Sequence, residues 1–385
     1  MKRVDYGSAL LIGTVTLGIL CGLSPQRFLD VFKVALTDRT TYDLALVVSL
    51  IPVLAYCMKE TGMVDELIEG VKKVLSGRAV LMILPALMGA LTMPGGALLS
   101  APLIDNEARK LKLNGEDRSF INVWFRHWNF FIYPLSSSLI LLASLTGISL
   151  YSLVLIQVLP LFLYLLLGYF MSVHRIEDDK AEGGQRGAAK SFLSISVNMS
   201  PILLAVLLNI LGVDMAVDLA LGIAFVFLLK RVKPRRIASL LKGGFEWRLP
   251  FAILGVMCFR YMVASSGAVS AILPYMQATG LSTTVFLIAL SWTIGLVTAM
   301  PTAGIAIIIP MAMMAVGHLT PILASILYLT MVFAYIISPM HLCLILTVEY
   351  YKSRLYAVYR KLIPATVVTY LVFLATALTI QNWWM

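Results

Sequence analysis

Residues 79–104 read AVLMILPALMGALTMPGGALLSAPLI, and residues 283–310 read TTVFLIALSWTIGLVTAMPTAGIAIIIP. Both stretches are uncharged and long enough to cross a bilayer, which takes about 20 helical residues. Each is interrupted near its middle by proline and small residues, at 94–96 and at 301–304. Two structures fit this pattern: a single kinked helix, or a re-entrant hairpin whose two ends lie on the same side of the membrane.

The composition of the whole chain also indicates a membrane protein. Of its 385 residues, 60% are hydrophobic and 13% are charged, with a mean hydropathy of +0.90, whereas soluble proteins carry about 25% charged residues. Too few polar side chains remain for a water-soluble surface, which excludes soluble enzymes, nucleic-acid binders and disordered chains. Nine further apolar spans are expected at 8–23, 42–58, 120–146, 149–173, 193–212, 214–231, 248–265, 320–349 and 362–381. The expected fold class is an all-α polytopic membrane protein.

The net charge of +10 is explained by the topology that these spans predict. If the N-terminus is inside and both interrupted stretches are re-entrant, the basic loops 105–118, 230–248 and 352–361 are cytoplasmic. The loops then predicted outside, 24–40, 145–153 and 311–317, carry only Arg27, Lys33 and Arg39. Lysine and arginine collect in cytoplasmic loops, so no nucleic-acid partner is needed. We expect the N-terminus inside and the C-terminus outside, in the cytoplasmic membrane.

The two halves of the chain repeat one another. Tyr56 and Tyr261, Pro134 and Pro339, and the motifs MPGGA and MPTAG are each separated by about 205 residues. Matching loops have opposite charge bias, as an inverted repeat requires. We therefore expect a first repeat at 1–173, a cytoplasmic linker at 174–190, an orientation-flipping helix at 191–213 and a second repeat at 214–385. Each repeat contains one hairpin, at 79–104 or 283–310, and one span broken by proline, at 120–146 or 320–349.

The two interrupted stretches are candidate ligand sites. A helix broken at mid-membrane leaves N–H and C=O groups without partners, and these are tolerated only in a protein-lined, wet cavity. Exposed N–H groups favour an anion, and exposed carbonyls favour a small cation. The alternative is a kinked helix whose small residues allow close packing. The candidates are Pro94, Gly95, Gly96 and Ala97 at one tip and Pro301, Thr302, Ala303 and Gly304 at the other.

The two proline-broken spans add hydroxyl and imidazole groups. The candidates are Ser136, Ser137 and Ser138 after one proline, and Ser338 and His341 on either side of the other. The serines can solvate an ion, or they can bond back to the preceding helical turn. His341 can couple protons or pair with an anion, or it can stay neutral on a backbone carbonyl.

Arg126 and His127 lie on the inner side of the span at 120–146. A guanidinium suits a carboxylate or phosphate, so Arg126 is a candidate counter-charge with an anion or coupling role. It could equally reach lipid headgroups between Trp124 and Trp128, and this anchoring role is the one we favour. Both hairpins lack acidic residues, so a sodium site would be built from carbonyls and hydroxyls. The four cysteines match no metal motif, and no metal or cofactor beyond a coupling Na⁺ is expected.

The run MPGGALLSAP at 93–102, followed by Trp124-Phe125-Arg126-His127, resembles an uncharacterised prokaryotic membrane family grouped with the ion transporter superfamily. That superfamily includes gluconate, C4-dicarboxylate and divalent-anion/sodium symporters. The resemblance covers nearly the whole chain and implies a homodimer with a scaffold domain and an elevator-like transport domain. It also implies that an amphipathic interfacial helix, expected at 62–75, is the arm joining them. The divalent-anion symporters carry Ser-Asn-Thr at the hairpin tips, where this chain has Pro-Gly-Gly and Pro-Thr-Ala-Gly.

Inverted repeats with paired broken helices are the architecture of secondary transporters. We therefore expect a permease for a small organic anion, coupled to sodium or protons, with elevator-type alternating access. The alternatives are an exporter or anion channel, an intramembrane enzyme that uses His341 and the serines at 136–138, and a structural scaffold. The zinc-protease, serine-hydrolase and P-loop motifs are missing from the sequence, so catalysis and intrinsic ATP drive are not expected.

Overall fold

The computed structural model describes residues 5–91, 96–177, 185–271, 274 and 280–383, which form helices and contain no strand. In the first half lie α1 (Tyr6–Leu20), α2 (Pro25–Thr37), α3 (Arg39–Glu60), α4 (Met63–Val74), α5 (Gly77–Ala90), α6 (Gly96–Lys110), α7 (Gly115–Arg126), α8 (Asn129–Ile132), α9 (Ser137–Thr146), α10 (Leu150–Gly168) and the π-helical turn η1 (Tyr169–Val173). In the second half lie α11 (Gln185–Ile210), α12 (Met215–Leu229), α13 (Pro234–Gly244), α14 (Arg248–Ser266), α16 (Thr283–Thr298), α17 (Pro301–Val316), α18 (Pro321–Ile337), α19 (Leu342–Tyr350) and α20 (Leu355–Trp383).

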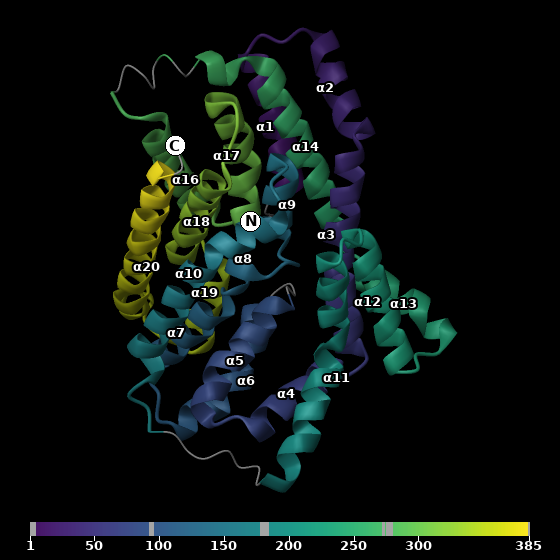
Figure 1. Ribbon diagram of the computed structural model, residues 1–385, viewed down its shortest axis with the longest axis vertical. Helices are drawn as coiled ribbons and strands as arrows, with labels where there is room; N and C mark the ends of the chain where they lie inside the picture. Colours follow the sequence, from purple (N-terminus) through teal and green to yellow (C-terminus); the bar gives the residue numbers. More distant parts are fainter. Residues whose placement is uncertain (1–4, 92–95, 178–184, 272–273, 275–279, 384–385) are drawn as a thin grey trace.

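The helices form two groups that lie side by side (Figure 1). The α14 group contains α1–α3 and α11–α14; in it, α1 and α3 pack on α14, and α12 packs on α3 and α11. The hairpin group contains α5–α10 and α16–α20; in it, α5 packs on α6 and α7, and α16 packs on α17 and α18. The short helix α4 contacts α3 and α11 on one side and α5 on the other, so it links the groups.

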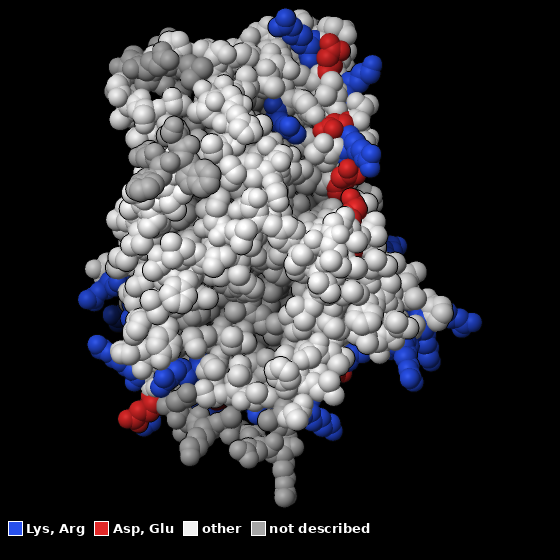
Figure 2. All heavy atoms as spheres, viewed as in Figure 1, with Lys and Arg blue, Asp and Glu red and all other residues white. Residues whose placement is uncertain are grey.

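Seven helical segments among the described residues are long and apolar enough to cross a membrane: 39–60, 115–146, 150–173, 189–210, 248–266, 321–350 and 355–381. The helices α1 and α12, which we expected to cross, are apolar but 15 residues long. Figure 2 shows charged side chains gathered at the lower end, around α13 and along α2, beside a broad uncharged surface. The chain is therefore an all-α, multi-pass membrane protein.

Both interrupted stretches form pairs of packed helices rather than straight spans. A Cβ added to Gly77, at the start of α5, would lie 3.3 Å from Leu111, just beyond the end of α6. The far ends of α5 and α6 therefore lie together. In the second pair, Ala299 adopts a left-handed conformation (φ +48°) between α16 and α17, and Pro301 opens α17. Figure 1 places α5–α6 in the lower part of the molecule and α16–α17 in the upper part.

The two broken spans begin and break in the same way. The side chain of Asn114 caps α7 by accepting a 2.8 Å hydrogen bond from Asp117 N, and Thr320 caps α18 through Leu323 N at 3.2 Å. Such caps satisfy N–H groups that the first helical turn leaves free. The helix stops again before Pro134 in one span and before Pro339 in the other. Proline lacks the N–H that a continuous helix would need there.

Three segments differ from the sequence expectation. Residues 25–37 and 234–244, expected as loops, are the helices α2 and α13, each with proline in the first turn. A short amphipathic helix has one charged face, so its average hydropathy is too low for it to be found by a search for apolar spans. The expected linker at 174–190 is shorter, because α11 already begins at Gln185.

Candidate functional site

Two histidines from the two broken spans meet in the interior of the hairpin group. His127 follows the last residue of α7, and His341 precedes the first residue of α19. Their Nε2 atoms are 3.2 Å apart, and both side chains are buried. The hydroxyl of Tyr335, near the end of α18, lies 3.2 Å from the Nε2 of His127. The breaks in the two spans therefore place two imidazoles and a phenol in contact.

The other ring nitrogen of each histidine faces a backbone carbonyl. The Nδ1 of His127 lies 2.5 Å from Val123 O, and the Nδ1 of His341 lies 3.2 Å from Ile336 O. A carbonyl oxygen only accepts hydrogen bonds, so each Nδ1 carries the proton and donates it. A neutral imidazole has one N–H, so both Nε2 atoms present lone pairs. In the neutral state, the Nε2 atoms of the two histidines are therefore two hydrogen-bond acceptors in contact.

Arg126 lies beside this pair, inside the protein. The residue is only 7% exposed, and its guanidinium interacts with the side chains of Cys343 and Tyr335. Its Nη1 atom is buried without a hydrogen-bond partner, and within the described residues Arg126 forms no salt bridge. The anchoring role that we favoured is wrong, because a side chain this buried does not reach headgroups. Arg126 is an interior cation whose charge the described residues do not neutralise.

The first hairpin packs against the break that carries Arg126 and His127. The indole of Trp128 donates to Ala86 O at 2.8 Å, and the Asn129 amide donates to Gly89 O at 3.1 Å. A Cβ on Gly89 would lie only 2.0 Å from the carbonyl oxygen of Arg126, so only glycine allows this approach. Of the sites predicted here, Pro94 and Gly95 lie outside the described residues, while Gly96 and Ala97 open α6.

The second hairpin packs against the other break. The Ser338 hydroxyl donates to Leu296 O at 2.6 Å, near the end of α16. The carbonyl of Thr302 accepts a 3.3 Å hydrogen bond from Tyr6 of α1, and a Cβ on Gly304 would meet Met331 at 2.6 Å. Pro301 and Ala303 are buried in the same turn of α17. These residues make helix contacts, and their recorded partners are not the histidines.

The serine run lies at the end of the first break, where Ser136 occupies the N-cap position of α9 without a capping side-chain hydrogen bond. Ser136 precedes α9, Ser137 opens it, and Ser136 and Ser138 are buried. Close by, the Tyr328 hydroxyl of α18 donates to the Phe130 carbonyl of α8 at 2.7 Å. On the cytoplasmic side predicted here, Asn122 of α7 bonds Thr347 of α19 at 3.0 Å. The two broken spans thus support each other across the middle of the hairpin group.

Of the predicted site residues, the structure brings together Arg126, His127 and His341. It adds two residues that the sequence analysis did not select, Tyr335 and Cys343. Cys343 was assigned to packing, although its place two residues after His341 was a visible signal. Tyr335 lies within an apolar run and carried no such signal.

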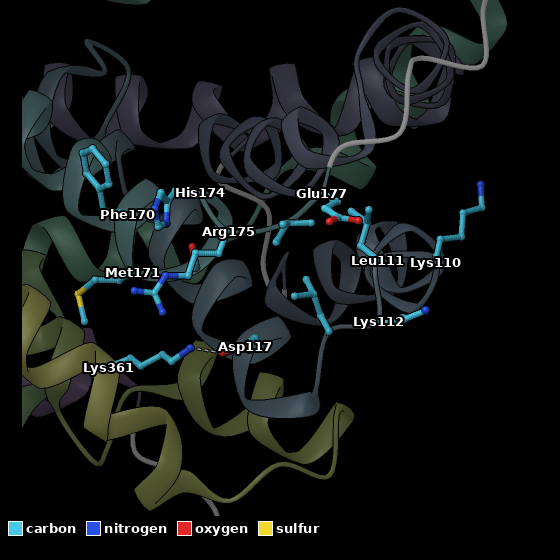
Figure 3. A pocket seen from close by; sticks show the side chains of 13 residues that line it. Lys110, Leu111, Lys112, Asp117, Phe170, Met171, His174, Arg175, Glu177 and Lys361 are labelled. Atoms are coloured by element: carbon cyan, nitrogen blue, oxygen red, sulfur yellow. Dashed lines mark hydrogen bonds and ion pairs between the residues drawn. The ribbon is translucent and has the colours of Figure 1, made fainter.

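A second polar feature is a recess of about 690 Å³ at the end of the hairpin group where η1 and α7 begin (Figure 3). Lys110, Lys112, Arg175 and Lys361 line it together with His174, Asp117 and Glu177. In Figure 3 the Lys361 ammonium points to Asp117, with which it forms an ion pair. The recess is basic and open, and it lies apart from the histidine pair.

A family model described as "Protein of unknown function (DUF401)" matches residues 1–380. The chain belongs to this family. No curated protein matches the DUF401 chain significantly in sequence.

Among solved structures, the DUF401 chain is similar to the YdaH transporter of Alcanivorax borkumensis, whose crystal structure is described as having an unusual topology. The TM-score is 0.58 at 13% sequence identity, over 98% of this chain and 97% of the other. At this identity the likeness establishes a shared fold over the whole length.

Proposed function

We propose that this chain is a secondary active transporter of a small organic anion, coupled to sodium or protons. The observation that carries the proposal is Arg126: a guanidinium held inside the protein beside two helix breaks, without a carboxylate partner. A buried charge without a partner is strongly unfavourable. Guanidinium pairs best with carboxylate or phosphate, so an anionic substrate would supply the missing charge.

Alternating access in such transporters rests on inverted repeats. Support for such repeats comes from helices that pair off about 205 residues apart: α1 with α12, α2 with α13, α3 with α14, α5 with α16, α6 with α17, α7–α9 with α18–α19, and α10 with α20. Among the helices of the described residues, α4 and α11 have no counterpart, and for α11 this agrees with an orientation-flipping helix.

Equivalent contacts recur at the same spacing. A Cβ on Gly89 would meet the backbone oxygen of Arg126, and a Cβ on Gly295 would meet that of Met331. Likewise Tyr164 bonds the carbonyl of Trp124, and Tyr370 bonds the hydroxyl of Thr330. Contacts that repeat this way support two copies of one packing unit and membership of the ion transporter superfamily.

An elevator mechanism would move the hairpin group along the α14 group, with α4 as the connecting arm. In its favour, part of the seam between the groups is apolar: Ile51 and Leu54 of α3 face Leu91 and Leu135 across a small cavity. The movement would break the hydrogen bonds from Tyr6 to Thr302 and from Tyr151 to Asn209, which join the two groups. A homodimer formed through the α14 group would hold the scaffold in place. The cytoplasmic membrane and the inside N-terminus remain part of this proposal.

Proton coupling is favoured over sodium coupling by the histidine pair. Imidazole changes charge near neutral pH, and a proton between the two Nε2 lone pairs would remove the acceptor–acceptor contact. Sodium coupling would instead need carbonyl and hydroxyl oxygens at the breaks.

The test uses the purified full chain in two assays. First, thermal unfolding in detergent is measured against carboxylates, sugar acids and phosphates, with and without sodium; a ligand at a hundredfold its dissociation constant adds about 2.7 kcal/mol of stability. Second, uptake of the stabilising anion into proteoliposomes is measured under sodium or proton gradients.

Arg126→Gln should abolish both responses, whereas Arg39→Gln, at a side chain 93% exposed, should change neither. Uptake by Arg126→Gln at the wild-type rate would refute the assigned site. Currents that do not saturate with substrate would indicate a channel instead.

A further inference from the structure

The two histidines bring two acceptor nitrogens into contact, and within the described residues no side chain places a positive charge between them. Both Nδ1 atoms lie next to carbonyls and donate to them, so with both imidazoles neutral the two Nε2 atoms are acceptors 3.2 Å apart. Two acceptors repel unless a positive centre lies between or beside them. The Tyr335 hydroxyl can donate to His127 only, which leaves the lone pair of His341 without a donor.

We propose that His127, His341 and Cys343 form a binding site for a borderline-soft divalent metal ion of the Zn²⁺ class. One ring nitrogen of each histidine and the Cys343 Sγ all lie within 4.8 Å of one another. Imidazole and thiolate together are the ligand set that Zn²⁺ prefers over Mg²⁺ or Ca²⁺. The site goes beyond the proposed function and does not depend on anion transport. A metal ion would compete with a coupling proton for the same two Nε2 lone pairs, so metal binding is an alternative to proton coupling through this pair.

The ligand spacing suits a tetrahedral ion. Bonds of about 2.0 Å to nitrogen and about 2.3 Å to sulfur place neighbouring ligand atoms roughly 3.3–3.6 Å apart in a tetrahedron. The observed 3.2 Å between the nitrogens already agrees with that value. Only the thiol would have to approach, and Cys343 lies in the first turn of α19, directly after the break.

The residues around the ligands hold them in the binding orientation. Metal-bound histidines usually donate their second N–H to a carbonyl or carboxylate, which sets the tautomer. Val123 O and Ile336 O do this here before any ion is bound. Val123 is in the last turn of α7, just before His127, and Ile336 is in the last turn of α18, a few residues before His341. The ends of these two helices therefore fix the orientation of both imidazole rings.

Arg126 sets the charge balance of the site. Its guanidinium interacts with the side chain of Cys343, the proposed sulfur ligand. A divalent ion, one thiolate and one guanidinium leave two positive charges in an apolar interior. Three protein ligands also leave a fourth tetrahedral position, which an anion would occupy; this last step rests on the proposed function.

The experiment titrates metal-free, detergent-purified full chain with Co²⁺, a spectroscopic stand-in for Zn²⁺. We expect one equivalent to bind, with visible bands of a tetrahedral ion and a near-ultraviolet thiolate-to-cobalt band, and Zn²⁺ to displace it. His127→Gln and His341→Gln should each weaken binding at least tenfold, and Cys343→Ser should remove the thiolate band. The matched controls His318→Gln, at an exposed loop residue, and Cys21→Ser should bind like wild type.

Two outcomes would overturn the site, and neither depends on transport. Wild-type protein that binds no Co²⁺ or Zn²⁺ at micromolar concentration refutes it without any variant, so misfolded variants cannot obscure the result. Undiminished binding in both histidine variants refutes it as well. Absence of anion uptake together with intact metal binding would count against the proposed function alone.

Discussion

The two broken spans have one architecture and different chemistry. Each begins at a side-chain cap, stops at a proline and packs against a hairpin. In the first span the functional groups precede the break, as Arg126 and His127; in the second they follow it, as His341 and Cys343. The positions 205 residues away hold other residue types: Met331 and Val332 in one span, Ser136 and Ser138 in the other. The two spans thus share a backbone arrangement, and they differ in the side chains that form the candidate site.

The largest effect is expected when Arg126 of the first span is replaced by methionine, the residue at the corresponding position 331 of the second span. Arg126→Met should reduce anion uptake at least a hundredfold, because the counter-charge is lost. The same change should raise the melting temperature by a few degrees, since replacing an unpartnered buried charge by an apolar side chain is often stabilising by about 1–4 kcal/mol. Uptake and thermal unfolding are measured on one preparation, with Met331→Leu as the control. A lower melting temperature would mean that Arg126 has a partner inside the protein.

The next largest effect concerns stability, and it compares the glycine contact of the first hairpin, at Gly89, with that of the second, at Gly295. Gly89→Ala should destabilise by at least about 3 kcal/mol, because the methyl group would lie 2.0 Å from a backbone oxygen that cannot rotate away. Gly295→Ala should cost about 1–2 kcal/mol less, since its tightest contacts are 2.8 Å. Denaturant unfolding of both variants checks the order, and equal losses would show that the two hairpins are packed equally tightly.

A smaller effect tests the hydrogen bond that holds the second hairpin. Ser338→Ala removes the donor to Leu296 O and should cost about 1 kcal/mol. Tyr133→Phe, at the corresponding position of the first span, should change stability less, because Phe keeps the ring that lines the small cavity beside Leu91 and Leu135. If both variants melt like wild type, side-chain bonds do not position either hairpin.

The smallest effect concerns the helix that links the two groups. Lys230 donates a 2.6 Å hydrogen bond to Glu66 of α4, and this lowers the pKa of Glu66 from its usual 4.5, with a further contribution from Asn198. A depressed carboxyl pKa stabilises the fold above the unfolded-state pKa, and the stabilisation disappears as the pH falls below about 4.5. The carboxyl is half exposed, so the contribution is below about 1 kcal/mol. Glu66→Gln should flatten the acid side of a melting-temperature profile, whereas Glu69→Gln should not.

Much of the fold could be predicted because it depends on local signals. The prolines at 134 and 339 mark both span breaks, and apolar length marks the membrane helices. Helices α2 and α13 were missed because three turns with a charged face resemble a loop in an apolar search. The resemblance to an uncharacterised membrane family was drawn from the motifs at 93–102 and 124–127, and the DUF401 family model matches residues 1–380. Membership of the ion transporter superfamily stays a prediction.

The site could be predicted only in part. Arg126, His127 and His341 were selected singly, since arginine and histidine are unusual in apolar spans. That the two histidines touch could not be predicted, because they lie 214 residues apart and no motif has that spacing. Cys343 and Tyr335 acquire their importance only through that contact. Whether Arg126 reaches headgroups depended on the depth of the break, which hydropathy does not report.

The hydrogen bond from Tyr328 to Phe130 also bears on how the protein is made. The Phe130 carbonyl lies in the break of the first span, and its partner is 198 residues further along the chain. During synthesis the first half therefore enters the bilayer with this carbonyl unsatisfied, which is unfavourable in hydrocarbon. Until the second half emerges, the ribosome-bound intermediate must keep that break next to water or the insertion machinery. Final closure of the hairpin group is thus a late, post-insertion step.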